Sequence, residues 1–477
     1  MSLPRAPQIA TTARPPRVST LVAAWALALL LGLQPITTDL YLPGLPGLAR
    51  ELGASMAAAM QTMAALILAF GLAQLVWGPV ADRLGRRPVW CLGLALYCAA
   101  SVGCALAPSI QALIGWRVLQ GAALAAAVVC ARAMLRDLYE PHEGARVMSI
   151  ALTGLGFIAL VGPPLGGVVV AALGWRAAFA TVAVCGVVVM VFVLVVLPET
   201  IAQKNPLATR PKPLLRAWWR IATNAEFQAW TALISATYGG LFTLLAASSF
   251  VYMDVLGLSA AAYGLALASC SGAYILGTVF CRRWIARHGL TRGVAIGARY
   301  TFAGGVSMLL LALLGVHTVW ALLLPQWLYS FGHGIHQPVG QAAAVGPFPQ
   351  HAGAASALAG FALALVAFAV GIWLGQALDG TVMPLALGMG FWALLTSAVA
   401  WVLVPRAERL ARAVVAPACR HCLWRGRRPL ARAPRHWLSR ASMMQRSSAS
   451  TRHRCTAAWM SARPRPVPLS APQCRTT

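Results

Sequence analysis

The sequence predicts an all-α membrane protein with twelve transmembrane helices in two six-helix halves. Three observations lead to this prediction. Of the 477 residues, 59% are hydrophobic and only 10% are charged, which is more apolar surface than a soluble protein of this length can bury. Twelve apolar runs of about 20 residues, the length that crosses a bilayer core as a helix, follow one another. One long polar segment divides them six and six, as in a chain built from two repeats.

The twelve runs define the predicted organisation of the chain. A cytoplasmic N-terminal tail (1–19) precedes an N-terminal half (20–197), a central cytoplasmic linker (198–226), a C-terminal half (227–405) and a basic tail (406–477). The first run is too long for the core of a signal peptide and no small-residue cleavage site follows it, so we expect it to remain in the mature protein. The runs lie at 20–42, 55–79, 88–107, 110–132, 146–172, 177–197, 227–250, 259–281, 293–314, 318–341, 352–378 and 382–404.

The distribution of basic residues predicts the orientation. If the N-terminus is cytoplasmic, the cytoplasmic segments before residue 300 hold eighteen Arg and Lys, whereas the opposite face holds only Arg50 and Arg176. This is a strong positive-inside bias. An even number of helices then returns the C-terminus to the cytoplasm. Within the linker, LLRAWWRI has the pattern of an amphipathic segment, but we interpret 198–226 as plain linker.

The net charge of +27 does not by itself indicate nucleic-acid binding. Residues 406–477 contribute +15 of it, with sixteen Arg and one acid, Glu408. This composition predicts disorder. The tail could bind anionic lipid headgroups. We favour a second interpretation, in which the tail is the translation product of a GC-rich gene read out of frame past its true end. Its single CxxC pair, Cys419 and Cys422, is too little for a zinc site, and we expect no metal.

Two charged residues lie inside apolar runs of the N-terminal half. Asp39 ends the apolar part of the first run, in ITTDLYLPGLP (36–46), and Pro43 and Pro46 predict a helix stop just beyond it. Arg117 lies about seven residues, or roughly 10 Å, into the fourth run. Intramembrane charges usually face a cavity and pair, so we expect Asp39 and Arg117 to meet in the outer half of the membrane. The alternative for Arg117 is snorkelling to the outer rim.

Three further stretches of this half carry candidate residues. The loop GPVADRLGRRPV (78–89) can act as a charged hinge, although an ordinary positive-inside loop would also be basic; a similar basic loop, CRRWIARHGLTRGV (281–294), recurs in the second half. The small residues of GLGFIALVGPPLGGVV (154–169) allow close helix packing, and its prolines permit a bend. The candidates are Gly78, Asp82, Arg83, Gly85, Arg86 and Arg87 in the loop, Arg117, Gln120 and Gly121 in the fourth run, and Gly154, Gly162, Pro163, Gly166 and Gly167 in the fifth.

The C-terminal half is poorer in polar groups. Its tenth run carries His333, His336 and Gln337, part of which share one helix face. With Tyr41 of the first half, they are candidates to line a substrate cavity. Hydrogen bonding between helices explains the same residues about as well.

These stretches together resemble the major facilitator superfamily, over roughly residues 20–405. GPVADRLGRRPV resembles its signature loop. ITTDLYLPGLP, WRVLQGAALAAAVVCARAMLRDLY (116–139) and GLGFIALVGPPLGGVV resemble the twelve-helix drug:proton antiporters of its bicyclomycin/chloramphenicol-resistance branch. The resemblance implies the major facilitator fold, with Asp39 in the cavity wall, a gating loop at 78–89 and a leak-sealing motif in the fifth helix. It implies proton-coupled efflux of small, mostly apolar drugs across the bacterial cytoplasmic (inner) membrane by a monomer, with the proton gradient and no other cofactor.

Enzyme chemistry has no support in the sequence. HExxH, P-loop and GxSxG motifs are absent, so neither hydrolysis nor ATP-driven transport is expected, and no nucleic-acid partner is expected either. Two alternatives to drug efflux stay open. One is export of a metabolite such as an amino acid or sugar, and the other is a membrane protein whose basic tail tethers lipid or nucleic acid.

Overall fold

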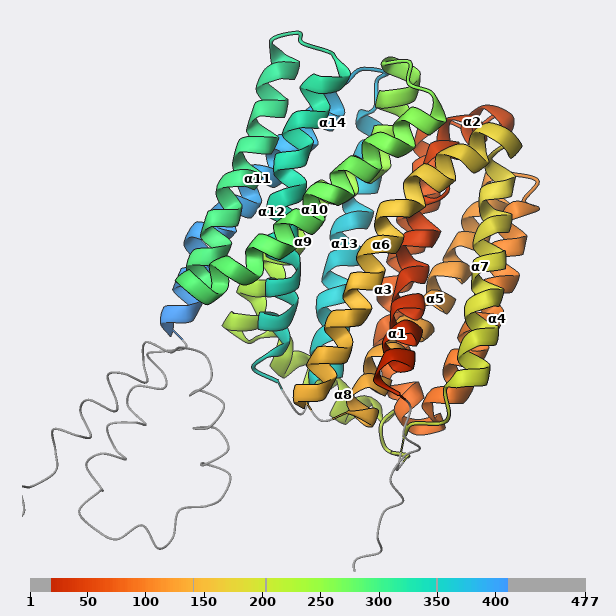
Figure 1. The fold of residues 1–477 in the computed structure, drawn as a ribbon, viewed down its shortest axis with the longest axis vertical. Coiled ribbons are helices and arrows are strands. Elements are labelled where there is room, and N and C mark those ends of the chain that lie inside the picture. Colours follow the sequence, from red (N-terminus) through yellow and green to blue (C-terminus); the bar gives the residue numbers. More distant parts are fainter. Residues whose placement is uncertain (1–18, 140, 202–203, 349–350, 411–477) are drawn as a thin grey trace, which may run out of the picture. The chain divides into compact units, whose positions relative to one another are not determined.

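A computed structural model describes residues 19–139, 141–201, 204–348 and 351–410 of the chain. Within these residues the structure is helical (Figure 1). The predictions for residues 1–18 and for the tail beyond Leu410 lie outside the described part. The helices are α1 (Thr20–Asp39), η1 (Leu42–Gly44), α2 (Leu45–Glu51), α3 (Met56–Leu84), α4 (Arg86–Ala105), α5 (Ile110–Leu138), α6 (Pro141–Leu173), α7 (Trp175–Val196), α8 (Pro211–Ala222), α9 (Ala225–Ser249), η2 (Phe250–Val255), α10 (Ala260–His288), α11 (Leu290–Leu313), α12 (Val319–Val345), α13 (Ala352–Ala377), α14 (Met383–Ala398) and η4 (Val399–Leu403).

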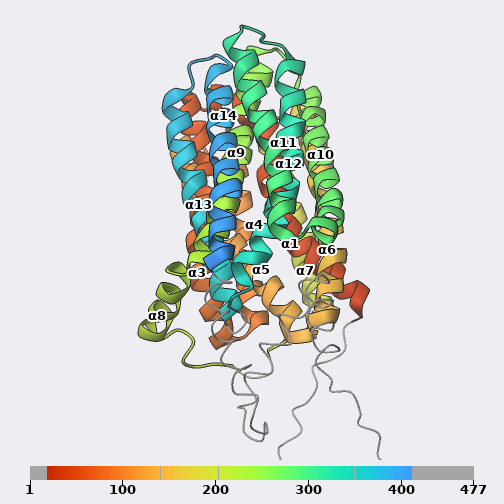
Figure 2. The same ribbon diagram turned by 90° about the vertical axis from the view of Figure 1, so that its left-hand side faces the viewer.

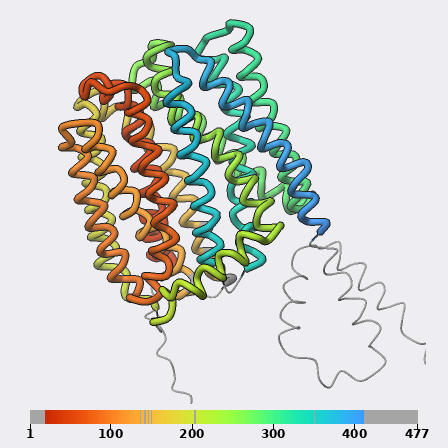
Figure 3. Tube along the Cα trace, turned by 180° about the vertical axis from the view of Figure 1, so that it is seen from behind, coloured from red at the N-terminus to blue at the C-terminus, as the bar shows by residue number. Residues whose placement is uncertain are grey.

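The long helices form two groups, as the sequence predicts. Figure 3 shows α1 and α3–α7 on one side of the bundle and α9–α14 on the other. Two helix pairs, α3 with α13 and α6 with α10, join the groups along their length. The pairs belong to equivalent positions of the two halves, because α3 and α10 are the second long helices and α6 and α13 the fifth.

Eleven helical segments of the described residues are long and apolar enough to cross a membrane. The remaining predicted span, the tenth run at 318–341, corresponds to α12, which has the necessary length at 27 residues. Its polar side chains, among them His333 and His336, lower its hydropathy. Because α12 packs between α9, α10 and α11, those side chains are covered by protein rather than lipid. The prediction of an all-α membrane fold is confirmed.

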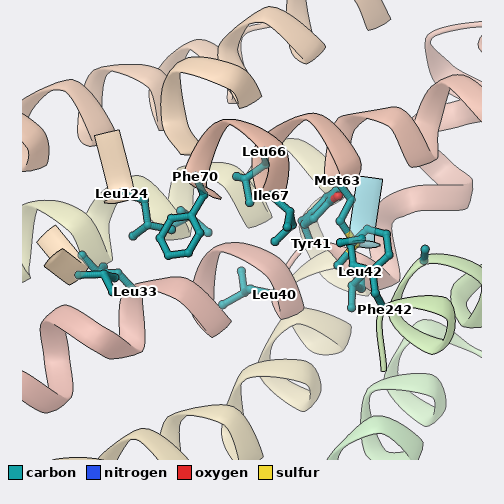
Figure 4. Close-up of a cluster of buried hydrophobic side chains, with 14 of the residues drawn as sticks. Leu33, Leu40, Tyr41, Leu42, Met63, Leu66, Ile67, Phe70, Leu124 and Phe242 are labelled. Carbon is teal, nitrogen blue, oxygen red and sulfur yellow. The ribbon is translucent and has the colours of Figure 1, made fainter. Parts of the chain in front are cut away.

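The surface and the core of the bundle are both apolar. Large side chains such as Leu173, Val195 and Leu314 are exposed on the outside, where a lipid chain would cover them. Inside, apolar side chains of α1, α3, α5 and α9 gather around the end of α1 (Figure 4). Since lipid is as apolar as these side chains, tight packing rather than the hydrophobic effect holds such helices together.

The two similar basic loops turn in the same way. In each half the second long helix ends at a glycine with positive φ, Gly85 at 113° and Gly289 at 82°, and the third begins at the next residue. Side chains with a Cβ rarely adopt this backbone conformation. The weak repeat in the sequence therefore reflects the same glycine turn between the second and third long helices of each half.

The two ends of the bundle are named here by the short helices that they carry. The α2 end is the predicted outer end, and the α8 end is the predicted cytoplasmic end. At the α2 end the halves are in contact, because η1 packs against α9 and α10 and α2 packs against η2. Arg50 Nη1 also lies 3.4 Å from Asp254 Oδ1 of the other half. The bundle is thus closed at the α2 end.

The first helix ends at Asp39, just before Pro43 and Pro46, as the sequence predicts. Each proline also stands in the first turn of a new short helix, η1 or α2, where a missing N–H costs nothing. The prediction of a plain linker was wrong, since residues 211–222 form α8. Its first-turn proline and amphipathic pattern favour a helix lying against an apolar surface.

Candidate functional site

Asp39 is the last residue of α1, but it lies inside the first membrane span. The chain continues through η1 and α2, so the span as a whole covers Thr20–Glu51. The carboxylate is half-buried, and its Oδ1 accepts a hydrogen bond of 2.7 Å from the Thr38 hydroxyl. A carboxylate at this depth is costly unless it is paired or protonated. Among the described acids of this half, Asp39 is the one that lies well inside a membrane span.

Arg117 is completely buried in α5, and it does not pair with Asp39. Its Nη1 donates to Gln120 Oε1 (2.8 Å) and to the Thr37 carbonyl (3.3 Å), and its Nε donates to the Thr62 carbonyl (3.4 Å). Among the described residues the ion pairs belong to Arg50, Arg86 and Arg176. The predicted Asp39–Arg117 ion pair is absent from this structure, because backbone carbonyls and an amide occupy the guanidinium.

The aromatic rings around Arg117 exclude the snorkelling alternative as well. The guanidinium lies 4.2 Å from the ring centroid of Tyr41 and 5.4 Å from that of Phe179, so cation–π attraction holds it inside. One nitrogen, Nη2, has no hydrogen-bond partner within the described residues. Arg117 is thus a buried cation with one donor nitrogen that no described residue accepts.

Gln120 extends this network to α4 and back to α1. Its Nε2 donates to Ser101 Oγ (2.7 Å), Ser101 donates to the Tyr97 carbonyl (2.7 Å), and the Tyr97 and Thr37 hydroxyls lie 2.6 Å apart. Gly121 lies against the backbone of α3, where a Cβ would overlap the Leu66 carbonyl. Arg117, Gln120 and Gly121 of the fourth-helix motif thus connect α5 to α1, α3 and α4 near the end of α1.

The fifth-helix motif surrounds Asp39 from the other side. Gly162 faces Asp39, and a Cβ there would lie 3.9 Å from the Asp39 Cβ. Gly166 lies so close to α1 that a Cβ would overlap the Leu40 carbonyl. About two turns before Gly162, Gly154 faces Ala28 of α1, where a Cβ would lie 2.9 Å from the Ala28 Cβ. These glycines let α6 pack directly on the end of α1.

The same stretch of α6 also contacts the C-terminal half. Cβ atoms built on Gly167 and on Gly264 of α10 would lie 2.5 Å from the carbonyl oxygens of Ala260 and Pro163, respectively. Just beyond Asp39, η1 contacts α9 and α10 of the other half. The motif therefore places Asp39 where the two halves meet.

Replacing Gly166 by Ala is expected to lower both stability and transport. The new methyl group must displace the α1 backbone, and overpacking of this kind costs about 1–3 kcal/mol. Gly156→Ala on the same helix is the matched control, because its Cβ would lie 3.8 Å from Ile275, an ordinary contact. Thermal unfolding of the purified variants and uptake by proteoliposomes measure the difference. Equal behaviour of the two variants would show that close packing on α1 is unimportant.

The predicted gating loop is an ion cluster centred on Arg86, whose side chain is 7% exposed. Arg86 Nη1 lies 2.6 Å from Asp82 Oδ1, and its Nε lies 3.1 Å from Asp137 Oδ2. Arg83 and Arg87 bond elsewhere, to the Thr209 hydroxyl and the Leu194 carbonyl. A Cβ on Gly78 would touch only Val129, at 3.9 Å.

Sequence reasoning missed two acids of this cluster, Asp137 and Glu199. Glu199 follows α7, and its carboxylate accepts the backbone N–H groups of Arg86 (3.0 Å) and Arg87 (3.1 Å) at the start of α4. A carboxylate at a helix N-terminus is stabilised by the helix dipole. The one signal in the sequence was the scarcity of acids, eleven in the whole chain. That three of them surround Arg86 is visible only in the structure.

The predicted cavity residues do not form one group. Tyr41 is buried in the N-terminal half beside Arg117. His333 faces α9 and α10, with Nδ1 3.1 Å from the Thr237 hydroxyl and its ring centroid 5.5 Å from that of Tyr274. His336 instead faces α11, with Nε2 3.2 Å from the Val294 carbonyl. Gln337 Oε1 has no partner within the described residues.

Comparison with known proteins gives one family. The profile of the Major Facilitator Superfamily matches residues 27–371. A bicyclomycin resistance protein homolog of Haemophilus influenzae is 27% identical over 373 residues, which cover 78% of this chain and 92% of the relative. Multidrug resistance protein D of Escherichia coli is 28% identical and covers 70% and 83%. A chloramphenicol resistance protein of Pseudomonas aeruginosa is 29% identical and covers 67% and 75%.

Solved structures agree on the fold. A D-xylose-proton symporter superposes with a TM-score of 0.62 at 17% identity, covering 82% of this chain and 98% of that one. A bacterial homolog of the human lysosomal transporter Spinster, in an inward-facing and occupied conformation, gives 0.60 at 14% identity, covering 81% and 96%. Because the family profile matches most of the chain and the fold agrees, the chain belongs to the major facilitator superfamily and is a multi-pass membrane transporter rather than an enzyme.

Proposed function

We propose that the protein exports small, mostly apolar drugs across the bacterial cytoplasmic membrane in exchange for protons, by alternating access. The observation that carries this proposal is the position of Asp39, half-buried within a membrane span where the glycines of α6 bring both halves together. The names of the drug-resistance relatives support the choice of substrate class. At 27–29% identity they favour drugs over metabolites without identifying one compound.

In this mechanism Asp39 takes up a proton from the outer side and releases it to the cytoplasm. When ionised it attracts a cationic or polar group of the substrate, or Arg117 after the halves rearrange. The free Nη2 of Arg117 supplies the donor for that second arrangement. The Arg86 cluster holds the α8 end of the N-terminal half together, and the α6–α10 contact seals the space between the halves against proton leakage.

Substrate class is tested by a susceptibility panel combined with proteoliposome transport. Cells that express the protein should tolerate higher concentrations of several structurally unrelated apolar antibiotics. Vesicles with an imposed proton gradient should accumulate the same compounds, and a protonophore should abolish the accumulation. Accumulation of amino acids or sugars without any drug would replace this proposal with metabolite export.

Removing residues 411–477 is expected to leave transport unchanged. The bundle continues to Leu410, and Glu408 accepts a hydrogen bond from the Thr291 hydroxyl of α11, so the cut must follow Leu410. A shorter chain ending at Pro405 is the control and should unfold at a lower temperature, because it lacks Glu408. Loss of transport on removal of 411–477 alone, at normal expression, would favour the tether hypothesis.

A further inference from the structure

Helix α8 is anchored at its C-terminal end, and the linker before it is bonded to the N-terminal half. At its C-terminal end Ile221 is fully buried with Phe227 and Trp230, and the Gln228 amide donates to the Ala222 carbonyl (2.9 Å). Before α8, the Asn205 N–H donates to the Asp82 carbonyl (2.9 Å). The buried Ile221 therefore defines the side of the last turn of α8 that faces the bundle.

The outward surface of α8 has two adjacent strips. Lys212, Arg216 and Arg220 are exposed and follow one another at four-residue intervals, which aligns them along one face of a helix. We call them the basic ridge. Beside them lies an apolar edge of Leu215 and Trp219, whose side chains are 58% and 74% exposed. An exposed tryptophan next to a row of cations is what a helix at a membrane surface carries.

The position of α8 agrees with such a surface. Figure 2 shows it at the end of the bundle, projecting sideways past α3, and it packs against α13. Helix α13 is one of the helices long and apolar enough to span the membrane. Helix α8 therefore lies at the rim of the bundle, where the surface of a bilayer would meet it.

We propose that α8 docks on the bilayer interface and binds anionic phospholipid headgroups through Lys212, Arg216 and Arg220, with Trp219 and Leu215 inserted among the acyl chains. The charges of residues 204–220 favour an anionic partner for this surface, because the stretch holds five basic residues and no acid. Lipid phosphates complement that charge. The chain's own tail, with sixteen Arg and one acid, would be repelled by it.

Hydrogen–deuterium exchange of the full-length protein in lipid nanodiscs tests the docking. Discs of phosphatidylcholine are compared with discs that also contain phosphatidylglycerol. For the wild type, we expect the amides of α8 to exchange at least about tenfold more slowly in the anionic discs, because each basic residue held near such a surface is attracted to it. The K212Q/R216Q/R220Q variant should lose this difference, and L215Q/W219Q should exchange faster in both discs.

The matched control is R282Q/R283Q/R287Q, which removes three exposed cations at the same end of the bundle. It should keep the slow exchange of α8 in anionic discs. Protection that is equal in the two lipids, or that survives loss of the basic ridge, would overturn the proposal and leave an acidic protein as the partner to seek. Exchange in the long helices reports whether each variant is folded, so a misfolded variant is recognised directly.

Discussion

Asn in place of Asp39 is expected to abolish proton-coupled efflux while the protein still folds and inserts. Within the described residues the other acids lie outside the membrane spans or within two residues of a span end, whereas Asp39 lies twelve residues before the end of its span. Asn keeps the shape and still accepts the Thr38 hydrogen bond, but it cannot release a proton. One proton moving down 100 mV supplies about 2.3 kcal/mol, equivalent to roughly a fiftyfold drug gradient, and this gradient should vanish.

The measurement is drug-driven proton movement in proteoliposomes, together with resistance of whole cells. Asp379→Asn is the control. That carboxylate lies in the loop between α13 and α14, where hydrogen bonds from Thr381 hold its pKa below its usual value, so it stays ionised across the assay range and should not contribute. Normal coupling in the Asp39→Asn variant would remove Asp39 from the mechanism and the proposed function with it.

The long helices could be predicted from the sequence because lipid leaves the backbone few choices. Every N–H and C=O inside a bilayer must bond internally, so each apolar run of sufficient length becomes a helix. The runs say nothing of short helices at the interface. The η1–α2 turn and α8 depend on proline positions and on one buried side chain, Ile221, and neither produces a long apolar run.

The residues of the candidate site could be found from the sequence, but not their partners. Asp39, Arg117 and the α6 glycines stand out as unusual in apolar helices. Depth along the membrane predicted that Asp39 and Arg117 would meet. It could not show that the Thr37 and Thr62 carbonyls, rather than the Asp39 carboxylate, would contact the guanidinium. That depends on the orientation of α1, α3 and α5 about their axes. Glu199 was missed since its partner is the backbone of α4, some hundred residues earlier.

The cluster around Arg86 gives the second large expected effect. Arg86→Gln should destabilise the protein by about 3 kcal/mol, because breaking a buried ion pair leaves an uncompensated charge. Asp137, 21% exposed, is the acid left behind, whereas Asp82 is 45% exposed and can be solvated. Transport should fall with stability, since Arg86 joins the end of α3 and the start of α4 to α5. Thermal unfolding in detergent and the initial rate of drug uptake measure the two effects.

A double-mutant cycle separates this ion pair from a general loss of positive charge. Asp137→Asn introduced into the Arg86→Gln variant removes the unpaired carboxylate, so the double variant should be more stable than Arg86→Gln alone. Arg83→Gln is the matched control, because Arg83 is exposed and bonds only a linker hydroxyl; it should cost less than about 1 kcal/mol. If Arg83→Gln and Arg86→Gln were equally destabilising, the loop would act through its net charge, and the positive-inside explanation would suffice. Coupling between residues 86 and 137 would instead show that a specific ion pair links α4 to α5 beside the end of α3. A change of conformation that separates these helices would then have to break that ion pair.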